Sequence, residues 1–151
     1  MKQIAWLYTA QVRKTNKATE KLPPRAERMK ESGLRLPIPN NPAPHLTDWL
    51  FDIGPVVPGG MGMARIGWQD IAAWQSVTGH ELAPWEASLL RSLSGEYLAM
   101  QNEASDPQTP APWIDQASVE ANREAVTNRL SHEADQRRRA REFLEAKKGG
   151  R

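Results

Sequence analysis

The sequence of 151 residues contains no cysteine and only three histidines, His45, His80 and His132. The absence of cysteine excludes a disulfide framework and every metal site that is built on thiolates. Three histidines this far apart in the chain do not match the ligand spacing of a zinc site. We therefore expect the protein to hold no metal ion and no cofactor.

Long hydrophobic runs are missing as well. The longest apolar run near the start, residues 4–8, is too short for the core of a signal peptide. No stretch approaches the roughly 18 apolar residues of a membrane-spanning helix. We therefore expect a cytoplasmic protein without membrane contact.

A recognisable catalytic pattern is the third absence. Glu81 and Glu86 lie close together in the sequence, with Asp48, Asp52 and Asp70 not far away, but no nucleophile or metal ligand accompanies them. The glycine-rich residues 54–63 lack the Gly-Lys-Ser/Thr of a phosphate-binding loop. We expect a mobile loop there, packing Val56, Val57 and the methionines. The pattern indicates a protein that is not an enzyme.

Composition predicts a small folded part with looser ends, because only 39% of the residues are hydrophobic and 12 are proline. We expect a mainly α fold, with two to three short helices in a small core, an N-terminal amphipathic helix and a long polar C-terminal helix. The expected parts are a basic N-terminal helix and proline-rich linker, a tryptophan-rich helical core, a second linker, and a polar basic C-terminal helix or tail. They span residues 1–44, 45–104, 105–114 and 115–151.

The small net charge of +2 hides a strong segregation of charge. Residues 1–45 carry nine Lys and Arg against three acids, residues 46–122 carry two against ten, and residues 123–151 carry nine against five. The middle of the chain is therefore acidic and both ends are basic. Such ends can lie on the middle, contact an acidic protein, touch nucleic acid or simply face water.

At the N-terminus, residues 3–21 have apolar residues near helical spacing and predict one short amphipathic helix. Those residues are Ile4, Leu7, Tyr8 and Val12. Pro23 and Pro24 would stop this helix, and residues 25–35 could form another turn or two that ends at Gly33. Four prolines in residues 36–44 favour an extended linker.

Three helices are expected in the core. Residues 45–53 have apolar side chains at positions i, i+3, i+4 and i+7, which is typical of one helix face. A second helix should run from about Trp68 to Thr78, with Gly67 as its N-cap and Gly79 in the left-handed conformation at its end. Pro84 should begin the third helix.

The third helix carries a continuous apolar stripe that should pack against the second helix. We expect Trp74 and Trp85 to anchor this contact. The stripe consists of Trp85, Leu89, Leu93, Tyr97 and Met100. The core residues that we expect from both helices are Ile71, Trp74, Val77, Leu89 and Leu93.

Aspartate 115 is expected to cap a long C-terminal helix in which apolar residues are sparse. Val119, Val126, Leu130 and Leu144 fall on a heptad-like seam, but Arg123, Glu133 and Arg137 fall on it too. We therefore expect an exposed helix rather than a stable coiled coil. The densest basic patch, Arg137, Arg138, Arg139 and Arg141, is the best argument for nucleic acid, although no aromatic residue is interleaved for base stacking.

Six tryptophans are more than so small a core can bury, so some should contact a partner. The second central helix begins Pro-Trp-Glu, which does not suit the reading helix of a helix-turn-helix protein. We assign partner binding to Trp49, Trp68, Trp85, Tyr97 and Trp113.

Residues 45–104 resemble the tail assembly chaperones of long-tailed bacteriophages and prophages. The matching positions are Trp68, Trp74, Gly79, Leu82, Pro84-Trp85-Glu86, Leu93-Ser94 and Tyr97-Leu98. The resemblance implies a non-catalytic helical protein of the bacterial host cytoplasm. It would bind the phage tape-measure protein, keep it soluble, help to recruit tail-tube subunits and leave before the virion is complete.

Two other functions stay open at this point. One is a small nucleic-acid-binding regulator that uses the basic C-terminal segment. The other is a structural protein of the virion, such as a head-tail or tail component. Whether the chain forms an oligomer is also open.

Overall fold

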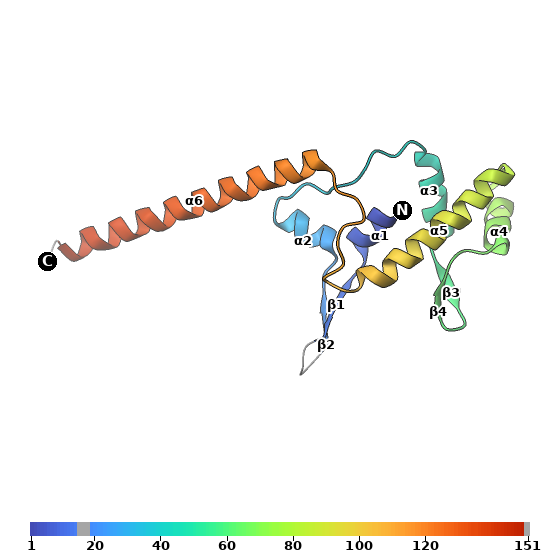
Figure 1. Cartoon of the computed structure of the whole chain (residues 1–151), viewed down its shortest axis with the longest axis horizontal. Coiled ribbons are helices and arrows are strands. Elements are labelled where there is room, and N and C mark those ends of the chain that lie inside the picture. Colours follow the sequence, from blue (N-terminus) through green and yellow to red (C-terminus); the bar gives the residue numbers. More distant parts are fainter. Residues whose placement is uncertain (15–18, 150–151) are drawn as a thin grey trace. The chain divides into compact units, whose positions relative to one another are not determined.

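The computed structural model describes residues 1–14 and 19–149, and these residues form a mainly helical protein with two small antiparallel hairpins (Figure 1). The expected mainly α fold with a long C-terminal helix is confirmed. The helices are α1 (Lys2–Tyr8), α2 (Arg25–Glu31), α3 (Pro44–Ile53), α4 (Trp68–Thr78), α5 (Pro84–Ala104) and α6 (Gln116–Gly149). The strands are β1 (Gln11–Lys14), β2 (Thr19–Leu22), β3 (Val57–Gly59) and β4 (Gly62–Ala64).

The chain divides into two compact units. The first unit combines Met1–Arg28 with Ile38–Trp113, and the second combines Met29–Pro37 with the chain from Ile114 onward. The compact part is therefore larger than the expected residues 45–104, because α1 packs with α5 and the backbone N–H of Val12 bonds to Ser105 just after α5. The linker that we expected at residues 36–44 has no helix or strand before α3 begins at Pro44.

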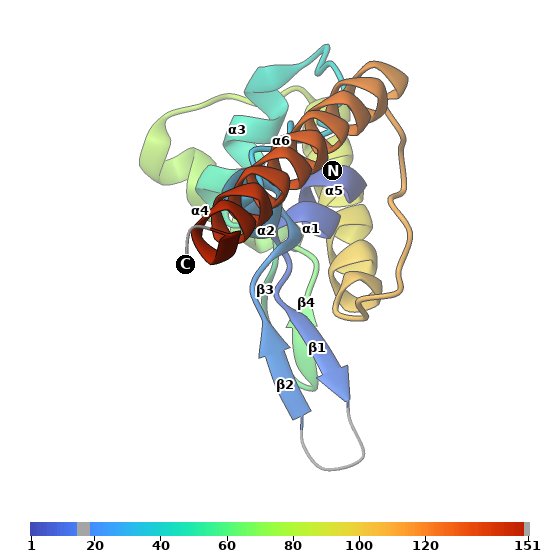
Figure 2. The same ribbon diagram turned by 90° about the vertical axis from the view of Figure 1, so that its left-hand side faces the viewer.

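The prediction of one helix over residues 3–21 is wrong for residues 9–14 and 19–21, and its residues 15–18 lie outside the described part of the chain. The backbone of Thr9 turns to an extended conformation, and its side-chain hydroxyl donates a hydrogen bond of 2.6 Å to the carbonyl of Ala5. β1 then pairs with β2 from Gln11 opposite Leu22 onward (Figure 2). The backbone N–H of Val12 also donates to the carbonyl of Ser105. A hydrogen-bond partner 93 positions away in the chain thus competes with the local helical pattern.

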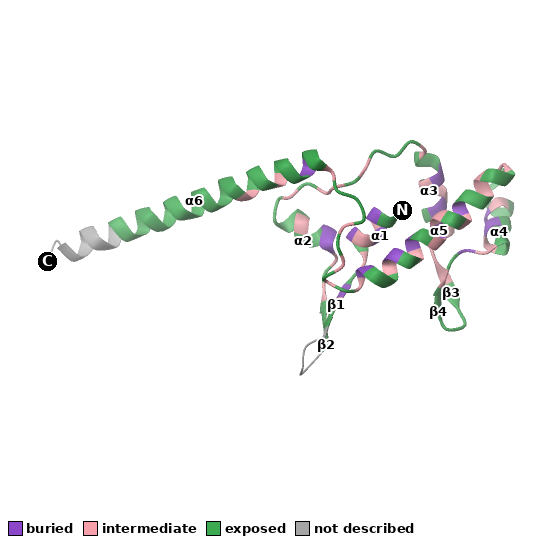
Figure 3. Ribbon diagram, viewed as in Figure 1, coloured by how far each residue is buried: buried purple, intermediate pink, exposed green. Residues whose placement is uncertain are grey.

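The core of the first unit consists of two hydrophobic clusters, and α5 contributes to both (Figure 3). The first cluster joins α3, α4 and α5 and contains Leu46, Leu50, Ile66, Ile71 and Leu90. The second joins α1 and α5 and contains Ala5, Tyr97, Met100 and Ala104. α5 therefore connects the two hydrophobic clusters of the first unit.

The ends of α4 and α5 follow from local sequence signals. Asp70 accepts a hydrogen bond of 2.7 Å from the backbone N–H of Gly67, and Gly79 ends α4 with φ of +72°. Glu86 accepts in the same way from the N–H of Ala83, and Pro84 occupies the first turn of α5. These contacts satisfy N–H groups that the helix itself leaves unpaired.

The buried face of α5 is rotated relative to the predicted stripe. Its buried residues are Leu90, Ser94, Tyr97, Met100 and Ala104. The hydroxyl of Ser94 accepts a hydrogen bond of 2.9 Å from the N–H of Ile66 and donates one of 2.7 Å to the carbonyl of Pro55. These two bonds hold Ser94 against the segment between α3 and α4. The side of α5 that carries Ser94 therefore faces the core.

Three residues that we expected in the core are exposed, two of them on the rotated α5 and Val77 on α4. Val77 is 87% exposed, Trp85 is 59% exposed, and Leu89 lies at the surface as well. Ile71 and Trp74 are buried, and Leu93 packs at the edge of the first cluster. Hydrophobic spacing could not show that a serine, and not an apolar residue, occupies the centre of the buried face.

Replacing Ser94 by alanine is expected to lower the free energy of unfolding by about 1–3 kcal/mol, because a buried N–H and a carbonyl lose their partner. Chemical denaturation would measure the loss. The matched control is Ser92→Ala on the exposed side of the same helix, which should change stability little. Equal effects of the two substitutions would contradict the role given to Ser94.

The glycine-rich residues after α3 form a hairpin, in which Val57 pairs with Ala64 and Gly59 with Gly62. Gly62 has φ of +130°, a backbone conformation that residues other than glycine rarely adopt. Met61 and Met63 are exposed, so the expectation that the methionines pack in a mobile loop is wrong.

The segment after α5 is not a free linker, because Arg25 binds it. This buried guanidinium donates hydrogen bonds of 2.8 Å to the carbonyls of Ala104 and Asp106, and of 3.1 Å to that of Trp6. The central carbon of the guanidinium lies 4.6 Å from the centre of the Trp6 ring. The indole N–H of Trp6 donates a hydrogen bond to the carbonyl of Thr109. Burial lowers the pKa of Arg25, and the nearby Arg28 lowers it further. Arg25 thus joins α1 to the end of α5.

The second unit contains α6 and residues 29–37. Asp115 accepts a hydrogen bond of 3.2 Å from the backbone N–H of Ser118, so it caps α6 as expected. Asn122 exchanges two hydrogen bonds with the backbone of Arg35. Over residues 1–14 and 19–149, no helix has the length and apolar character that crossing a membrane would need.

Candidate partner-binding surface

The large apolar side chains that α4 and α5 leave in water are the first candidates for a functional site. Trp68 at the start of α4 is 52% exposed, and Trp85 at the start of α5 is 59% exposed. Val77 and Leu89 on the same two helices are exposed as well. We call these four residues the exposed apolar set. Large apolar groups of this kind on a surface are typical of sites that bind another protein.

The side chain of Trp68 is oriented by a charged neighbour. The guanidinium carbon of Arg91 lies 5.0 Å from the centre of the Trp68 ring, which is the distance of a cation–π contact. Arg91 is half-buried on α5, so this contact links the start of α4 to the middle of α5. No spacing pattern indicates this pair, because the two residues are 23 positions apart in the sequence.

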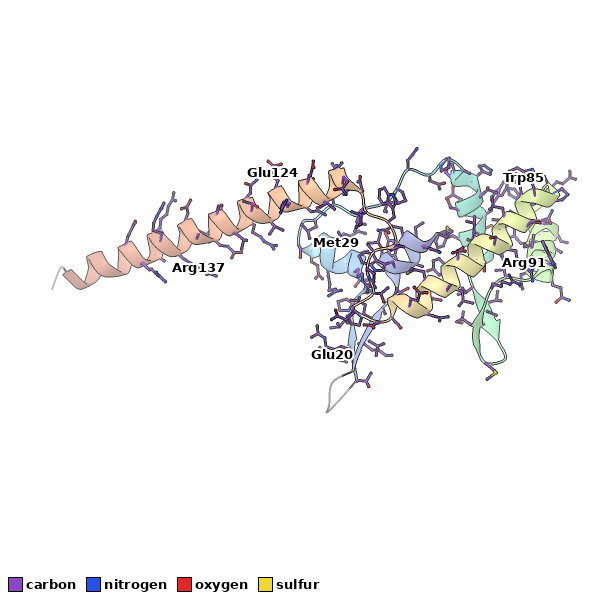
Figure 4. The ribbon with its side chains drawn as sticks, viewed as in Figure 1. Glu20, Met29, Trp85, Arg91, Glu124 and Arg137 are labelled. Carbon is purple, nitrogen blue, oxygen red and sulfur yellow. The ribbon has the colours of Figure 1, made fainter. Side chains whose placement is uncertain are left out.

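Trp85 and Leu89 are one turn apart on α5 and project away from its core. Successive residues of a helix are rotated by about 100°, so positions 85 and 89 share a face that lies well away from Leu90 and Ser94. Figure 4 labels Trp85 near one end of α5. The predicted stripe is thus real as a pattern, but its first half faces solvent.

Trp49 belongs to an aromatic cluster in which Trp74 is buried and His80 is exposed. Its ring centre lies 6.0 Å from that of Trp74 and 5.4 Å from that of His80, and His80 stacks on Trp74 at 4.8 Å. The Trp74 indole N–H donates a hydrogen bond of 2.6 Å to Asp52. Trp49 is therefore half-buried and held on two sides. Sequence reasoning missed His80 and Asp52, because their partners lie on other elements.

Tyr97 is a core residue, which corrects its assignment to a partner. Only 8% of it is exposed, and its ring meets that of Phe51 edge to face at 6.0 Å. Burial raises the pKa of the Tyr97 hydroxyl. A partner could reach this side chain only if α5 were uncovered.

Trp113 lies at the rim of a shallow hollow of about 340 Å³. Pro39, Leu93 and Pro112 also line this hollow, and the ion pair between Lys2 and Glu96, 2.9 Å apart, borders it. The carboxamide of Gln3, which is buried beside it, has no hydrogen-bond partner among the described residues. The hollow is thus a second place where the first unit offers an aromatic side chain to a ligand.

The basic patch lies on α6, and its side chains are exposed. Arg137 lies 3.9 Å from Glu133, and Arg138 lies 3.0 Å from Asp135. Because consecutive residues of a helix point in directions about 100° apart, Arg137, Arg138 and Arg139 do not share one face. The patch is therefore partly neutralised and spread around the helix.

Acidic and histidine side chains do not gather into a metal site anywhere in the described ranges, 1–14 and 19–149.

No known protein family, curated protein or solved structure matches this chain. The arrangement offers apolar and aromatic contact from helices. Such a surface suits the binding of another polypeptide.

Proposed function

We propose that this chain is a non-catalytic binding protein that covers apolar helical segments of a phage tape-measure protein and helps to recruit tail-tube subunits, as tail assembly chaperones do. One observation carries the proposal. Trp68 and Trp85 are more than half exposed on two helices whose own core is complete without them.

The exposed indoles of Trp68 and Trp85 are not needed to complete the core. Ile71, Leu90 and their neighbours fill the contact between α3, α4 and α5, so the exposed indoles add little to folding. Burying a large apolar side chain contributes about 1.5–3 kcal/mol, and this gain is still available when a partner binds. Tryptophan is also the residue type most enriched among the strongest contacts of protein interfaces.

The chemistry of the surface favours a helical partner with an apolar stripe. Trp85 and Leu89 are one helical turn apart, and apolar residues at the same interval on a partner helix would meet them. Residues 46–122 carry an excess of eight negative charges, so the rim of the partner should be neutral or basic at this surface. The basic ends of the chain can contact acidic stretches of the same partner.

The choice of the tape-measure protein rests on the resemblance of residues 45–104 to tail assembly chaperones. A long helical protein with apolar stretches aggregates when those stretches are bare, and a small helical protein that covers them keeps it in solution. The same resemblance supports the bacterial host cytoplasm as the place of action.

The proposal predicts that replacing Trp68 and Trp85 together by alanine will reduce capture of the tape-measure protein by at least roughly tenfold. A tagged full-length chain and a purified fragment of the tape-measure protein would be used in a pull-down. Tyr8→Ala is the matched control, because Tyr8 is an exposed aromatic residue on α1. Equal capture by the double variant and the control would contradict the assignment of this surface.

A nucleic-acid-binding regulator is the second candidate, and the exposure of Arg137, Arg138, Arg139 and Arg141 is the observation in its favour. Their ion pairs and their different directions around α6 weaken it. Tight binding of duplex DNA with a steep dependence on salt would support this candidate instead. Presence of the chain in purified virions would point to a structural tail or head-tail protein.

A further inference from the structure

The long helix α6 is exposed, and the proposed function does not account for this exposure. Most of the side chains that the structure describes on α6, over residues 116–142, are exposed, as Figure 3 shows. Its exposed ion pairs give a helix little stability. A helix that is polar on most sides and still 34 residues long suits a partner helix better than isolation.

One seam of α6 has the spacing of a coiled coil. The residues on it alternate at intervals of four and three positions, and they are Val119, Arg123, Val126, Leu130, Glu133, Arg137 and Ala140. Val119 and Leu130 are exposed although they are apolar, and Val126 is half-buried. Figure 4 shows Glu124, which is off the seam, on the side of α6 opposite Arg137.

The charged residues on this seam become favourable in one particular arrangement. Suppose that two copies of α6 lie antiparallel and cross near residue 128. Each residue before position 128 then faces the residue of the second copy that lies equally far after position 128. Val126 then faces Leu130 of the second copy, and Arg123 faces Glu133 of the second copy. The two apolar layers at the centre are flanked on both sides by a pair of opposite charges.

The outer layers also fit. Val119 faces Arg137 of the second copy, whose long aliphatic stem can cover the valine while the guanidinium reaches water. The contact of Asn122 with the backbone of Arg35 leaves Val119, Arg123 and Leu130 exposed for this pairing.

A parallel pair would lack this complementarity. In register, it would place Arg123 on Arg123, Glu133 on Glu133 and Arg137 on Arg137, and like charges facing each other destabilise an interface. The charges that interrupt the apolar seam thus select the antiparallel direction. We propose that a second copy of this chain is the partner of the α6 seam, in an antiparallel two-helix coiled coil centred near residue 128.

Sedimentation equilibrium of the full-length chain over a wide range of concentration tests the dimer. The apparent mass should rise with concentration from 16.9 kDa towards twice that value. Arg123→Glu should raise the dissociation constant by more than roughly tenfold, because it sets two pairs of like charges against each other. A chain that stays monomeric throughout, or a variant that dimerises like the wild type, would overturn the proposal.

Rescue separates the proposed register from a general effect on the helix. The double variant with Arg123→Glu and Glu133→Arg restores opposite charges across the interface, so dimerisation should return close to the wild-type level. Arg139→Glu makes the same change of charge off the seam and should leave the dissociation constant nearly unchanged. Failure of the rescue, or an equal loss with the control variant, would overturn the register.

Direction can be read by cross-linking, because the chain has no cysteine of its own. A mixture of the Val126→Cys and Leu130→Cys variants should form a disulfide between position 126 of one copy and position 130 of the other. Peptide mapping would identify the bond. A predominance of bonds between two copies of position 126 would show a parallel pair and refute the antiparallel arrangement.

Discussion

Replacing Arg25 by methionine is expected to lower the free energy of unfolding of the first unit by about 3–5 kcal/mol, because it breaks a buried, charged network. The substitution leaves the carbonyls of Trp6, Ala104 and Asp106 without their donor. It also removes the cation–π contact with Trp6.

Urea unfolding followed by tryptophan fluorescence would measure this effect, since Trp6 lies directly against the guanidinium. The control is Arg13→Met, which makes the same substitution on an exposed arginine of β1 and should change stability by less than about 0.5 kcal/mol. A loss at Arg25 as small as that at Arg13 would show that α1 and the end of α5 are held together by other contacts.

The second large effect is expected at Trp74, where alanine should cost about 3–5 kcal/mol. Trp74 is 8% exposed, stacks on His80 and donates a hydrogen bond to Asp52. Its removal would leave a cavity between α3 and α4 and a carboxylate without its partner. Trp49, which contacts both rings, would lose its support as well.

Trp85→Ala is the matched comparison, because Trp85 is a tryptophan near the start of the neighbouring helix but is 59% exposed. We expect it to lower the free energy of unfolding by less than about 1 kcal/mol. Thermal or chemical unfolding of both variants would test the difference. Similar losses at the two positions would mean that Trp85 is packed and not on the surface.

The contrast between these tryptophans shows which features of the fold could be predicted from the sequence. The ends of α4 and α5 could be predicted, because Asp70, Gly79, Pro84 and Glu86 act on backbone groups only a few residues away. The rotation of α5 could not, because it depends on a serine that bonds segments 28 and 39 positions away.

The N-terminal hairpin and the binding of Arg25 escaped prediction for the same physical reason. Residues 11–22 have no strong alternation of apolar and polar residues, and β1 gains its place partly from a bond to Ser105. Nothing near Arg25 in the sequence indicates that its acceptors are the carbonyls at the end of α5. Contacts between distant segments decide these features, and spacing along the chain does not record them.

The candidate site was predictable in kind and not in detail. The number of tryptophans showed that some must be exposed, since a core of this size cannot bury six. The sequence did not distinguish Trp68 and Trp85, which are exposed, from Tyr97, which is buried. Trp85 and Tyr97 lie on the same predicted stripe of α5, and only the packing of that helix separates them.

Co-expression with the tape-measure protein is the decisive experiment for the proposed chaperone function. The soluble yield of the tape-measure protein would be measured with the full-length chain, without it, and with the variant that lacks Trp68 and Trp85. We expect a soluble partner with the wild-type chain and an aggregated one both without the chain and with the variant. A tape-measure protein that is equally soluble in all three cases would contradict it.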